Sequence, residues 1–253
     1  MKVPIINLQN EKTGEVEVPQ VFSTTVRHDV IKKAVVHLQS TRFQPQGRDP
    51  MAGKHNTAES RGTGHGIARV PRLKGSSRAA FGVSIVGGHA AFPPRSEKVI
   101  VKRINKKEKR FAIRSGIAAT AVKELVEKRG HKFESEHLPI VVSNELESLV
   151  KTKDVEAVFQ AIGVQADVER ADRRKVRAGR GKMRGRKHKK GKGPLIVVSE
   201  DNGIGNAARN LPGVEISSVA GLNAELLAPG AHPGRLVIWT EAAFGEIDEV
   251  WME

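Results

Sequence analysis

The feature that most constrains this chain is a stretch of 58 residues, 41–98, with no sustained hydrophobic period of either helix or strand type. It holds ten Lys and Arg against three Asp and Glu, together with nine glycines. Such a segment cannot bury enough apolar surface to offset the entropy lost when its backbone is ordered. A structureless loop of this length is uncommon inside a compact domain unless the loop is functional. We therefore expect something outside the protein to give it shape, and a polyanion is the simplest candidate.

Charge is unevenly distributed along the 253 residues, and this distribution narrows the class of partner. The net charge of +15 and the isoelectric point near 10.2 exceed what solubility requires, which favours a nucleic-acid partner. Residues 41–98 carry +7, residues 99–110 carry +5 and residues 167–193 carry +10, whereas residues 194–253 carry −7. Two basic segments therefore interrupt a body that is close to neutral or acidic.

The second basic segment, residues 167–193, is most concentrated between Arg173 and Gly193, with twelve Lys and Arg, five glycines and no acidic residue. Charge runs of this kind are often solvated, disordered tails or localisation signals. This one is internal, between a predicted helix and a predicted buried strand, so both of its ends are held. Held ends and glycine breaks suit a loop that lies along phosphates, because glycine lets backbone amides come close. We favour phosphate binding over a merely solvated loop.

Short apolar runs alternate with helical patterns along the rest of the chain. Residues 138–142 and 195–198 are unbroken apolar runs, which suit strands buried on both faces. The alternation predicts an α/β class: a three-layer domain with a mainly parallel central sheet. The predicted globular domain comprises residues 1–40 and 99–253, and residues 41–98 form the long extended loop. The remaining expected elements are strands at 3–8, 14–18, 214–219 and 236–240, and helices at 29–40, 105–130, 145–162, 206–210, 224–228 and 241–250.

The sequence offers no catalytic constellation, metal site or cofactor site. There is no cysteine, and the nine histidines include no i,i+4 pair or HExxH arrangement. No G-x-S-x-G elbow occurs, and carboxylates cluster only at 241–249, where a solvated helix face is the simpler interpretation. Aromatic residues make up only 4% of the chain, which argues against base-stacking platforms of the single-strand-binding type. No apolar run resembles a signal peptide or a membrane span, so we expect a soluble protein, cytoplasmic or organellar, without a membrane partner.

One glycine-rich turn supports an alternative of a different class, a nucleotide-dependent α/β enzyme. Residues Gly203 to Ala208 formally match G-x-G-x-x-A after the strand predicted at 195–198. However, Glu200 and Asp201 lie where a pyrophosphate would approach, and like charge repels it. A flexible helix entry is the favoured interpretation. A further alternative is a free regulator that binds RNA or DNA outside any larger assembly.

Several motifs along the chain are more specific than a generic basic loop. The most specific are Arg61-Gly-Thr-Gly-His-Gly-Ile-Ala-Arg69 followed by Val70-Pro-Arg72, and Phe92-Pro-Pro-Arg95. Supporting motifs are Lys109-Arg-Phe-Ala-Ile-Arg-Ser-Gly-Ile-Ala-Ala-Thr-Ala121, Gly185-Arg-Lys-His188, Ala207-Ala-Arg-Asn210 and Leu236-Val-Ile-Trp-Thr-Glu241. Together they resemble the universal family of large-subunit ribosomal protein four, in its archaeal and eukaryotic form, and the resemblance covers nearly the whole chain.

This resemblance implies a structural, non-enzymatic component of the large ribosomal subunit in the cytoplasm, which binds ribosomal RNA and supports subunit assembly. It implies an α/β domain on the outside of the subunit and a long loop threaded into the RNA. It also implies that the loop tip lines the peptide exit tunnel beside large-subunit protein twenty-two and meets the nascent peptide. Bacterial members have Lys-Gly-Thr-Gly-Arg at the tip and a shorter second arm, whereas this chain has Arg61 and His65. The implied tip residues are Arg61, Gly62, Thr63, Gly64, His65, Gly66 and Arg69.

The predicted contacts to ribosomal RNA are basic side chains, because Lys and Arg neutralise phosphates. Those of the long loop and its return into the body are Arg42, Arg48, Lys54, Arg61, Arg69, Arg72, Lys74, Arg78, Arg95, Arg103, Lys106, Lys107 and Arg110. Those of the second arm are Arg173, Arg174, Lys175, Arg177, Arg180, Lys182, Arg184, Arg186, Lys187, Lys189 and Lys190.

Overall fold

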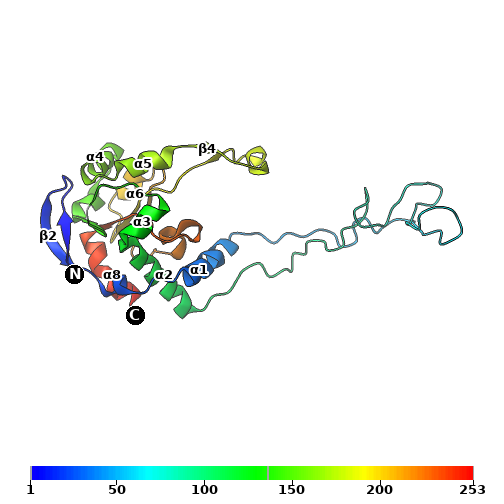
Figure 1. Ribbon diagram of the computed structural model, residues 1–253, viewed down its shortest axis with the longest axis horizontal. Helices are drawn as coiled ribbons and strands as arrows, with labels where there is room; N and C mark the ends of the chain where they lie inside the picture. The colour runs from blue at the N-terminus through cyan, green and yellow to red at the C-terminus, as the bar shows by residue number, and fades with distance from the viewer. Residues whose placement is uncertain (1, 136, 253) are drawn as a thin grey trace. The chain divides into compact units, whose positions relative to one another are not determined.

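The computed structural model describes residues 2–135 and 137–252 of the chain (Figure 1). Contacts between residues divide it into two units. The first, which we call the body, comprises Met1–Leu38 and Arg103–Glu253. The second, which we call the loop unit, comprises Gln39–Lys102.

The body is built on a six-stranded sheet with the strand order β2-β1-β3-β8-β6-β7. Every neighbouring pair is parallel except β1 and β2, which form an antiparallel hairpin at one edge. This confirms the predicted α/β class with a mainly parallel central sheet. The strands are β1 (Lys2–Ile6), β2 (Lys12–Glu17), β3 (Ile140–Val142), β6 (Leu195–Val198), β7 (Glu215–Ser218) and β8 (Val237–Thr240).

Eight α-helices are found in the described residues, and those of the body cover both faces of the sheet (Figure 1). Helices α1, α2, α7 and α8 pack on one face, and α3, α4, α5 and α6 pack on the other. None of them is long and apolar enough to cross a membrane. Their bounds are α1 (His28–Ser40), α2 (Lys106–Ala121), α3 (Lys123–Arg129), α4 (Thr152–Ile162), α5 (Gln165–Asp172), α6 (Ile204–Ala208), α7 (Ala224–Leu227) and α8 (Glu241–Trp251). Single 3₁₀ turns are η1 (Gln20–Ser23), η2 (Asn144–Ser148), η3 (Arg180–Arg184) and η4 (Pro229–Ala231).

The unbroken apolar runs serve both layers because successive strand residues point to opposite faces. In β6, Leu195 and Val197 belong to the cluster under α1 and α2, whereas Ile196 and Val198 belong to the cluster under α4 and α6. Trp239 of β8 is fully buried in the first cluster, with the Phe244 ring centroid 6.2 Å from its own. These two clusters are the apolar core of the body.

Two of the predicted helices are wrong in their extent. The helix predicted over 105–130 is broken at Val122, whose extended backbone (φ −86°, ψ 104°) separates α2 from α3. This break has no Gly or Pro signal, and it places Val126 on the opposite face of the sheet from Ile117. The helix predicted over 145–162 is a 3₁₀ turn, η2, followed by α4.

The second basic segment begins later than its charge predicts. Residues 167–172, which the charge pattern places in that segment, belong to α5. Asp167, Val168 and Ala171 are buried against the body, so this part of the segment is core structure. The basic projection begins only after Asp172, and we call residues 173–193 the arm hairpin.

Candidate nucleic-acid interface

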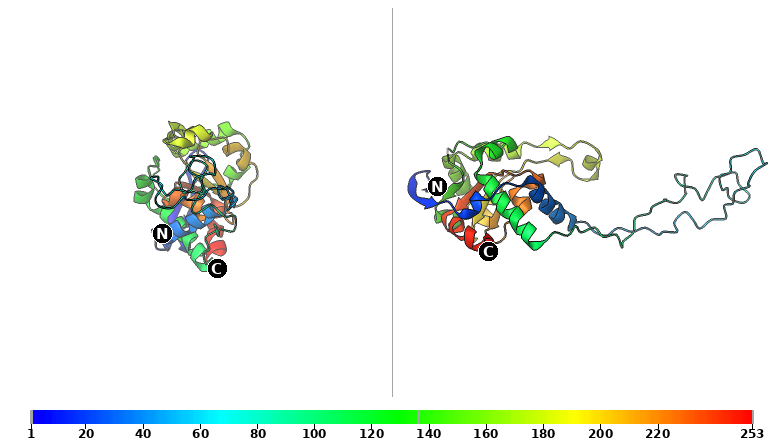
Figure 2. Two further views of the ribbon diagram at one scale, coloured as in Figure 1. Left: turned by 90° about the vertical axis from the view of Figure 1, so that its right-hand side faces the viewer. Right: turned by 60° about the horizontal axis from the view of Figure 1, so that its bottom comes forward.

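The arm hairpin is an ordered antiparallel element of the body (Figure 2). Its strands, β4 (Lys175–Val176) and β5 (His188–Lys189), pair Lys175 with Lys189. The backbone N–H of Arg177 donates to the carbonyl of Lys187 at 2.8 Å, and the turn η3 closes the far end. The segment predicted as a loop is therefore a basic hairpin with a defined register.

The cations of this hairpin are directed to solvent. Among the described residues, Arg177 is the only predicted arm contact whose side chain makes a hydrogen bond, from Nε to the carbonyl of Arg186 at 3.1 Å. Arg177 is half-buried, whereas the other predicted arm cations are exposed. Like charges held this close repel one another, so an anion of high charge density would stabilise the arrangement. The hairpin thus presents an uncompensated positive ridge.

A buried guanidinium fixes the base of the arm hairpin. Arg235, fully buried just before β8, donates from Nη1 to Oε2 of Glu215 at 2.5 Å. Glu215 also forms an ion pair with Lys192 at the returning end of the hairpin. Sequence reasoning missed Arg235, because a single arginine beside an apolar strand gives no local sign that it will be buried. Its remaining acceptors are the carbonyls of Leu226 (2.9 Å), Gly193 (3.0 Å), Gly213 (3.3 Å) and Pro194 (3.5 Å).

A second polar cluster ties the same base to α5. Arg170 donates from Nε to Oδ1 of Asp167 at 2.8 Å and from Nη2 to the carbonyl of Lys192 at 2.6 Å. Oδ2 of Asp167 lies 2.9 Å from Nδ1 of the buried His131. Burial alone would raise the pKa of Asp167, but hydrogen bonds from His131 and Arg170 outweigh it and lower that pKa. The charged carboxylate of Asp167 therefore holds Arg170 in place, and Arg170 joins α5 to the returning end of the arm hairpin.

After the last two residues of α1, the loop unit contains no helix or regular strand in its described residues, but it has local order of its own. Glu59 and Arg72 exchange two backbone hydrogen bonds of 3.1 Å, and Ala80 donates to Pro71 at 2.9 Å. The outgoing and returning segments lie side by side where the N–H of Arg48 donates to the carbonyl of Pro94 at 3.1 Å.

Arg72 is partly used inside the loop unit. It is half-buried, and its Nη1 donates to the carbonyl of Ser77. Its role as an RNA contact remains a prediction. Fewer N–H donors of its guanidinium are free to bind RNA than at Arg61 or Arg69. Lys74 forms an exposed ion pair with Glu59 at 3.4 Å, a contact of little energetic weight in water.

The implied tip is a small closed loop. Oγ of Ser60 donates to the carbonyl of Arg69 at 3.0 Å and accepts from the N–H of Gly62 at 3.3 Å. Gly64 adopts a φ of +88°, a left-handed conformation that favours glycine, and an added Cβ there would meet open space. Among the described residues, the exposed side chains of Arg61 and Arg69 have no hydrogen-bonding partner.

Exposed aromatic residues of the loop unit were not among the predicted contacts. Phe92 is 96% exposed and Phe43 is 66% exposed. Each lies within three residues of an arginine, Arg95 and Arg42 respectively. The low aromatic content of the chain argued against base stacking, yet bare phenyl rings beside cations are suited to stack on unpaired bases.

The remaining predicted cations lie where the chain re-enters the body after the loop unit. Arg103, Lys106, Lys107 and Arg110 are exposed before and within the first turns of α2. On the same helix Glu108 accepts from Lys33 of α1 at 2.7 Å, so this carboxylate is already paired.

The Gly203–Ala208 turn does not present a free phosphate cradle. Oδ1 of Asp201 accepts from the N–H of Gly205 at 2.9 Å and from that of Gly203 at 3.2 Å. These amides open α6, where a pyrophosphate would have to bind. The carboxylate of the chain itself occupies that position, which weakens the nucleotide-enzyme alternative.

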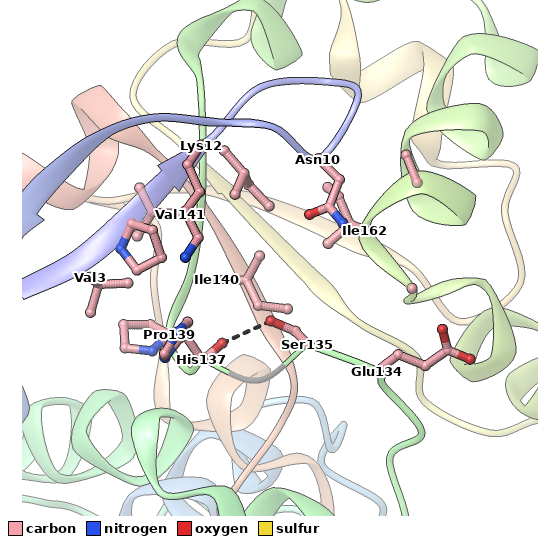
Figure 3. A pocket seen from close by; sticks show the side chains of 14 residues that line it. Val3, Asn10, Lys12, Glu134, Ser135, His137, Pro139, Ile140, Val141 and Ile162 are labelled. Atoms are coloured by element: carbon pink, nitrogen blue, oxygen red, sulfur yellow. Dashed lines mark hydrogen bonds between the residues drawn. The ribbon is translucent and has the colours of Figure 1, made fainter.

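A cavity of about 330 Å³ lies between the β1–β2 hairpin, the segment before β3 and the end of α4 (Figure 3). Its lining mixes Lys12 and His137 with Glu134 over an apolar floor that includes Ile140. Because its charges are mixed, it does not extend the basic surface. Among the described residues, no group of three His, Cys, Asp or Glu could hold a metal ion.

Comparison with known proteins now decides the family. The family model for the ribosomal protein L4/L1 family matches residues 16–250. The chain belongs to this family. Proteins called large ribosomal subunit protein uL4 are similar over their whole length. The one from Archaeoglobus fulgidus is 54% identical over 100% of both chains, and the one from Methanosphaera stadtmanae is 48% identical over 100% of this chain and 98% of its own. That from Methanoculleus marisnigri is 51% identical over 98% of this chain and 99% of its own.

Reversing charge at the tip of this L4/L1-family chain should not change its stability. We expect Arg61→Glu to alter the free energy of unfolding of the isolated protein by less than about 0.5 kcal/mol, since the side chain is exposed and unpaired. Thermal melting, monitored by circular dichroism, measures this change in stability. A large drop in melting temperature would show that the tip packs against other parts of the chain, contrary to the extended-loop prediction.

Proposed function

We propose that this protein is a structural constituent of the large ribosomal subunit that binds ribosomal RNA and is not an enzyme. The observation that carries the proposal is the concentration of exposed cations in the arm hairpin and the loop unit of an L4/L1-family chain. Its relatives are named as large-subunit proteins and match along their whole length.

Binding is proposed to work by charge neutralisation and close backbone approach. Lys and Arg of the two basic elements replace the counterions of RNA phosphates, and the release of those counterions drives association. The pairing of β4 with β5 holds the arm cations in a fixed pattern, and Arg235 and Arg170 hold the base of the hairpin. In the loop unit, RNA supplies the packing surface that the sequence lacks.

The loop tip is proposed to reach the peptide exit tunnel. On this proposal the residues from Arg61 to Arg69 line the tunnel near the nascent peptide, beside large-subunit protein twenty-two. Its support is the motif resemblance, together with a tip whose two arginines are free to contact RNA. On the same proposal, the body binds at the surface of the subunit, and the loop unit threads into the RNA.

Sedimentation with purified large subunits tests the proposal. The protein should remain with the subunit at a salt concentration that strips a nonspecific RNA-binding protein. Salt weakens phosphate contacts in both proteins, but it does not release a loop that is threaded through folded RNA. A free regulator would instead dissociate. Equilibrium binding of a dinucleotide to the isolated protein tests the enzyme alternative, and saturable binding at Gly203–Ala208 that an Asp201→Ala substitution strengthens would support that alternative.

A further inference from the structure

A second cavity, of about 510 Å³, lies on the body outside both basic elements. It is formed by the start of α1, one face of α3 and the segment before β8. Its volume falls within the range of about 300–1,000 Å³ that is usual for small-molecule sites. No carboxylate is among the residues that line it, which are His28, Leu125, Lys128, Arg129, His232 and Pro233.

One wall of this cavity is held in place by Arg129. Its Nη1 donates to the carbonyl of His232 and its Nη2 donates to the carbonyl of Pro229 at 3.2 Å. A guanidinium has five N–H donors, so the side chain keeps donors for a ligand while it fixes the wall. Gly234 lies so close to α3 that an added Cβ would be 2.6 Å from the carbonyl oxygen of Leu125. The segment before β8 is therefore seated firmly against α3.

The charge around the cavity is not balanced by acids of the chain. Burial, together with the positive charges of Arg235 and Arg170, lowers the pKa of Arg129 to about 10. Asp29, beside His28, is occupied by Arg27, whose Nη2 donates to Oδ2 at 2.6 Å. That hydrogen bond lowers the pKa of Asp29 to about 2 and keeps its charge paired. An anion entering the cavity would meet cations with no competing carboxylate in the lining.

We propose that this cavity takes one nucleotide of the bound RNA, with its phosphate at Lys128 and Arg129. The base then lies against Leu125 and Pro233, beside the imidazoles of His28 and His232. Cations for the phosphate and flat or apolar side chains for the base are the two requirements of a nucleotide site in RNA recognition. The proposal rests on the proposed function, and it adds a contact point that none of the basic elements contains.

Two substitutions in the full chain test it, Lys128→Ala and His232→Ala. The second keeps the backbone carbonyl that Arg129 holds, so the wall should stay in place. Loss of one phosphate contact lowers the slope of log K against log salt by about 0.7–0.9, which corresponds to about five- to eightfold weaker binding at 0.1 M salt. We expect this loss for Lys128→Ala with large-subunit ribosomal RNA, and a loss without a change of slope for His232→Ala. Lys153→Ala, an exposed lysine of α4 outside the cavity, is the matched control and should bind as the unaltered protein does.

Free ligands separate a nucleotide of the RNA from a free nucleotide or phosphate. Adenosine monophosphate and inorganic phosphate are titrated separately into the unaltered protein, and amide chemical shifts of α3 and residues 232–234 are followed. Weakened RNA binding in Lys128→Ala and His232→Ala supports the proposal, whether or not the small ligands shift these amides. Unchanged RNA affinity in both variants overturns it, and shifts with adenosine monophosphate would then identify a site for free nucleotides. If the unaltered protein binds RNA without salt dependence, the proposed function fails as well.

Discussion

Affinity for large-subunit ribosomal RNA is expected to fall about a thousandfold at 0.1 M salt when four exposed arm cations become glutamine. Each lost phosphate contact lowers the slope of log K against log salt by about 0.7–0.9, so four contacts together lower it by about 3. Arg177 is left unchanged because it closes the hairpin through the carbonyl of Arg186. The substituted residues are Lys175, Lys182, Arg184 and Lys187.

Filter binding across a salt series measures both the affinity and the slope. The matched control carries the same loss of charge at exposed lysines outside the basic elements, Lys2, Lys32, Lys151 and Lys153. We expect it to change the slope little, since those lysines are not predicted contacts. Equal losses in both variants would mean that general charge attraction, and not the hairpin, accounts for binding. An unchanged slope in the arm variant would mean that the hairpin is only a solvated projection.

Removing the guanidinium of Arg235 is expected to cost about 3–5 kcal/mol of unfolding free energy, the range for breaking a buried ion pair. Arg235→Ala leaves Glu215 without its buried partner and leaves carbonyls at Gly193 and Leu226 without a donor. A domain with about 5–15 kcal/mol of total stability has little reserve against such a loss. The melting temperature should fall by about 6–20 °C.

Denaturant unfolding of the isolated protein measures this cost. Arg209→Ala is the control, because Arg209 is an exposed arginine without a partner among the described residues, and its loss should matter by less than about 0.5 kcal/mol. If Arg235→Ala unfolds like the control, the carbonyl cluster around Arg235 is not a structural support of the hairpin base.

The layers of the fold were predictable because their signal is local. An unbroken apolar run such as Leu195–Val198 is stable only where both faces of the strand are covered, and the structure places it as β6, between β8 and β7. The break at Val122 was not predictable, because no glycine or proline marks it and it depends on which face of the sheet Val126 packs against. The extent of α5 was obscured by charge, since Asp167 reads as a solvated residue until its partners His131 and Arg170 are known.

Composition identified the basic elements but not their internal structure. Two-residue strands such as β4 and β5 are too short to show a period, so the hairpin register was invisible in the sequence. Arg235 and Glu215 lie 20 residues apart, and only the parallel arrangement of β7, β6 and β8 brings them together. The lining of the cavity at Lys128 and His232 is likewise a product of tertiary structure, and neither residue lies in a motif.

The most direct test of the account uses the absence of cysteine from the chain. Thr63→Cys then places a single thiol at the exposed tip of the loop unit, where a photo-crosslinking reagent can be attached. The labelled protein is incorporated into large subunits and irradiated with and without a nascent peptide. We predict crosslinks to large-subunit ribosomal RNA in both cases, and to the nascent peptide when it is present. A tip that forms no crosslink to RNA and reacts with a bulky thiol reagent as fast in the subunit as in the free protein would contradict the account.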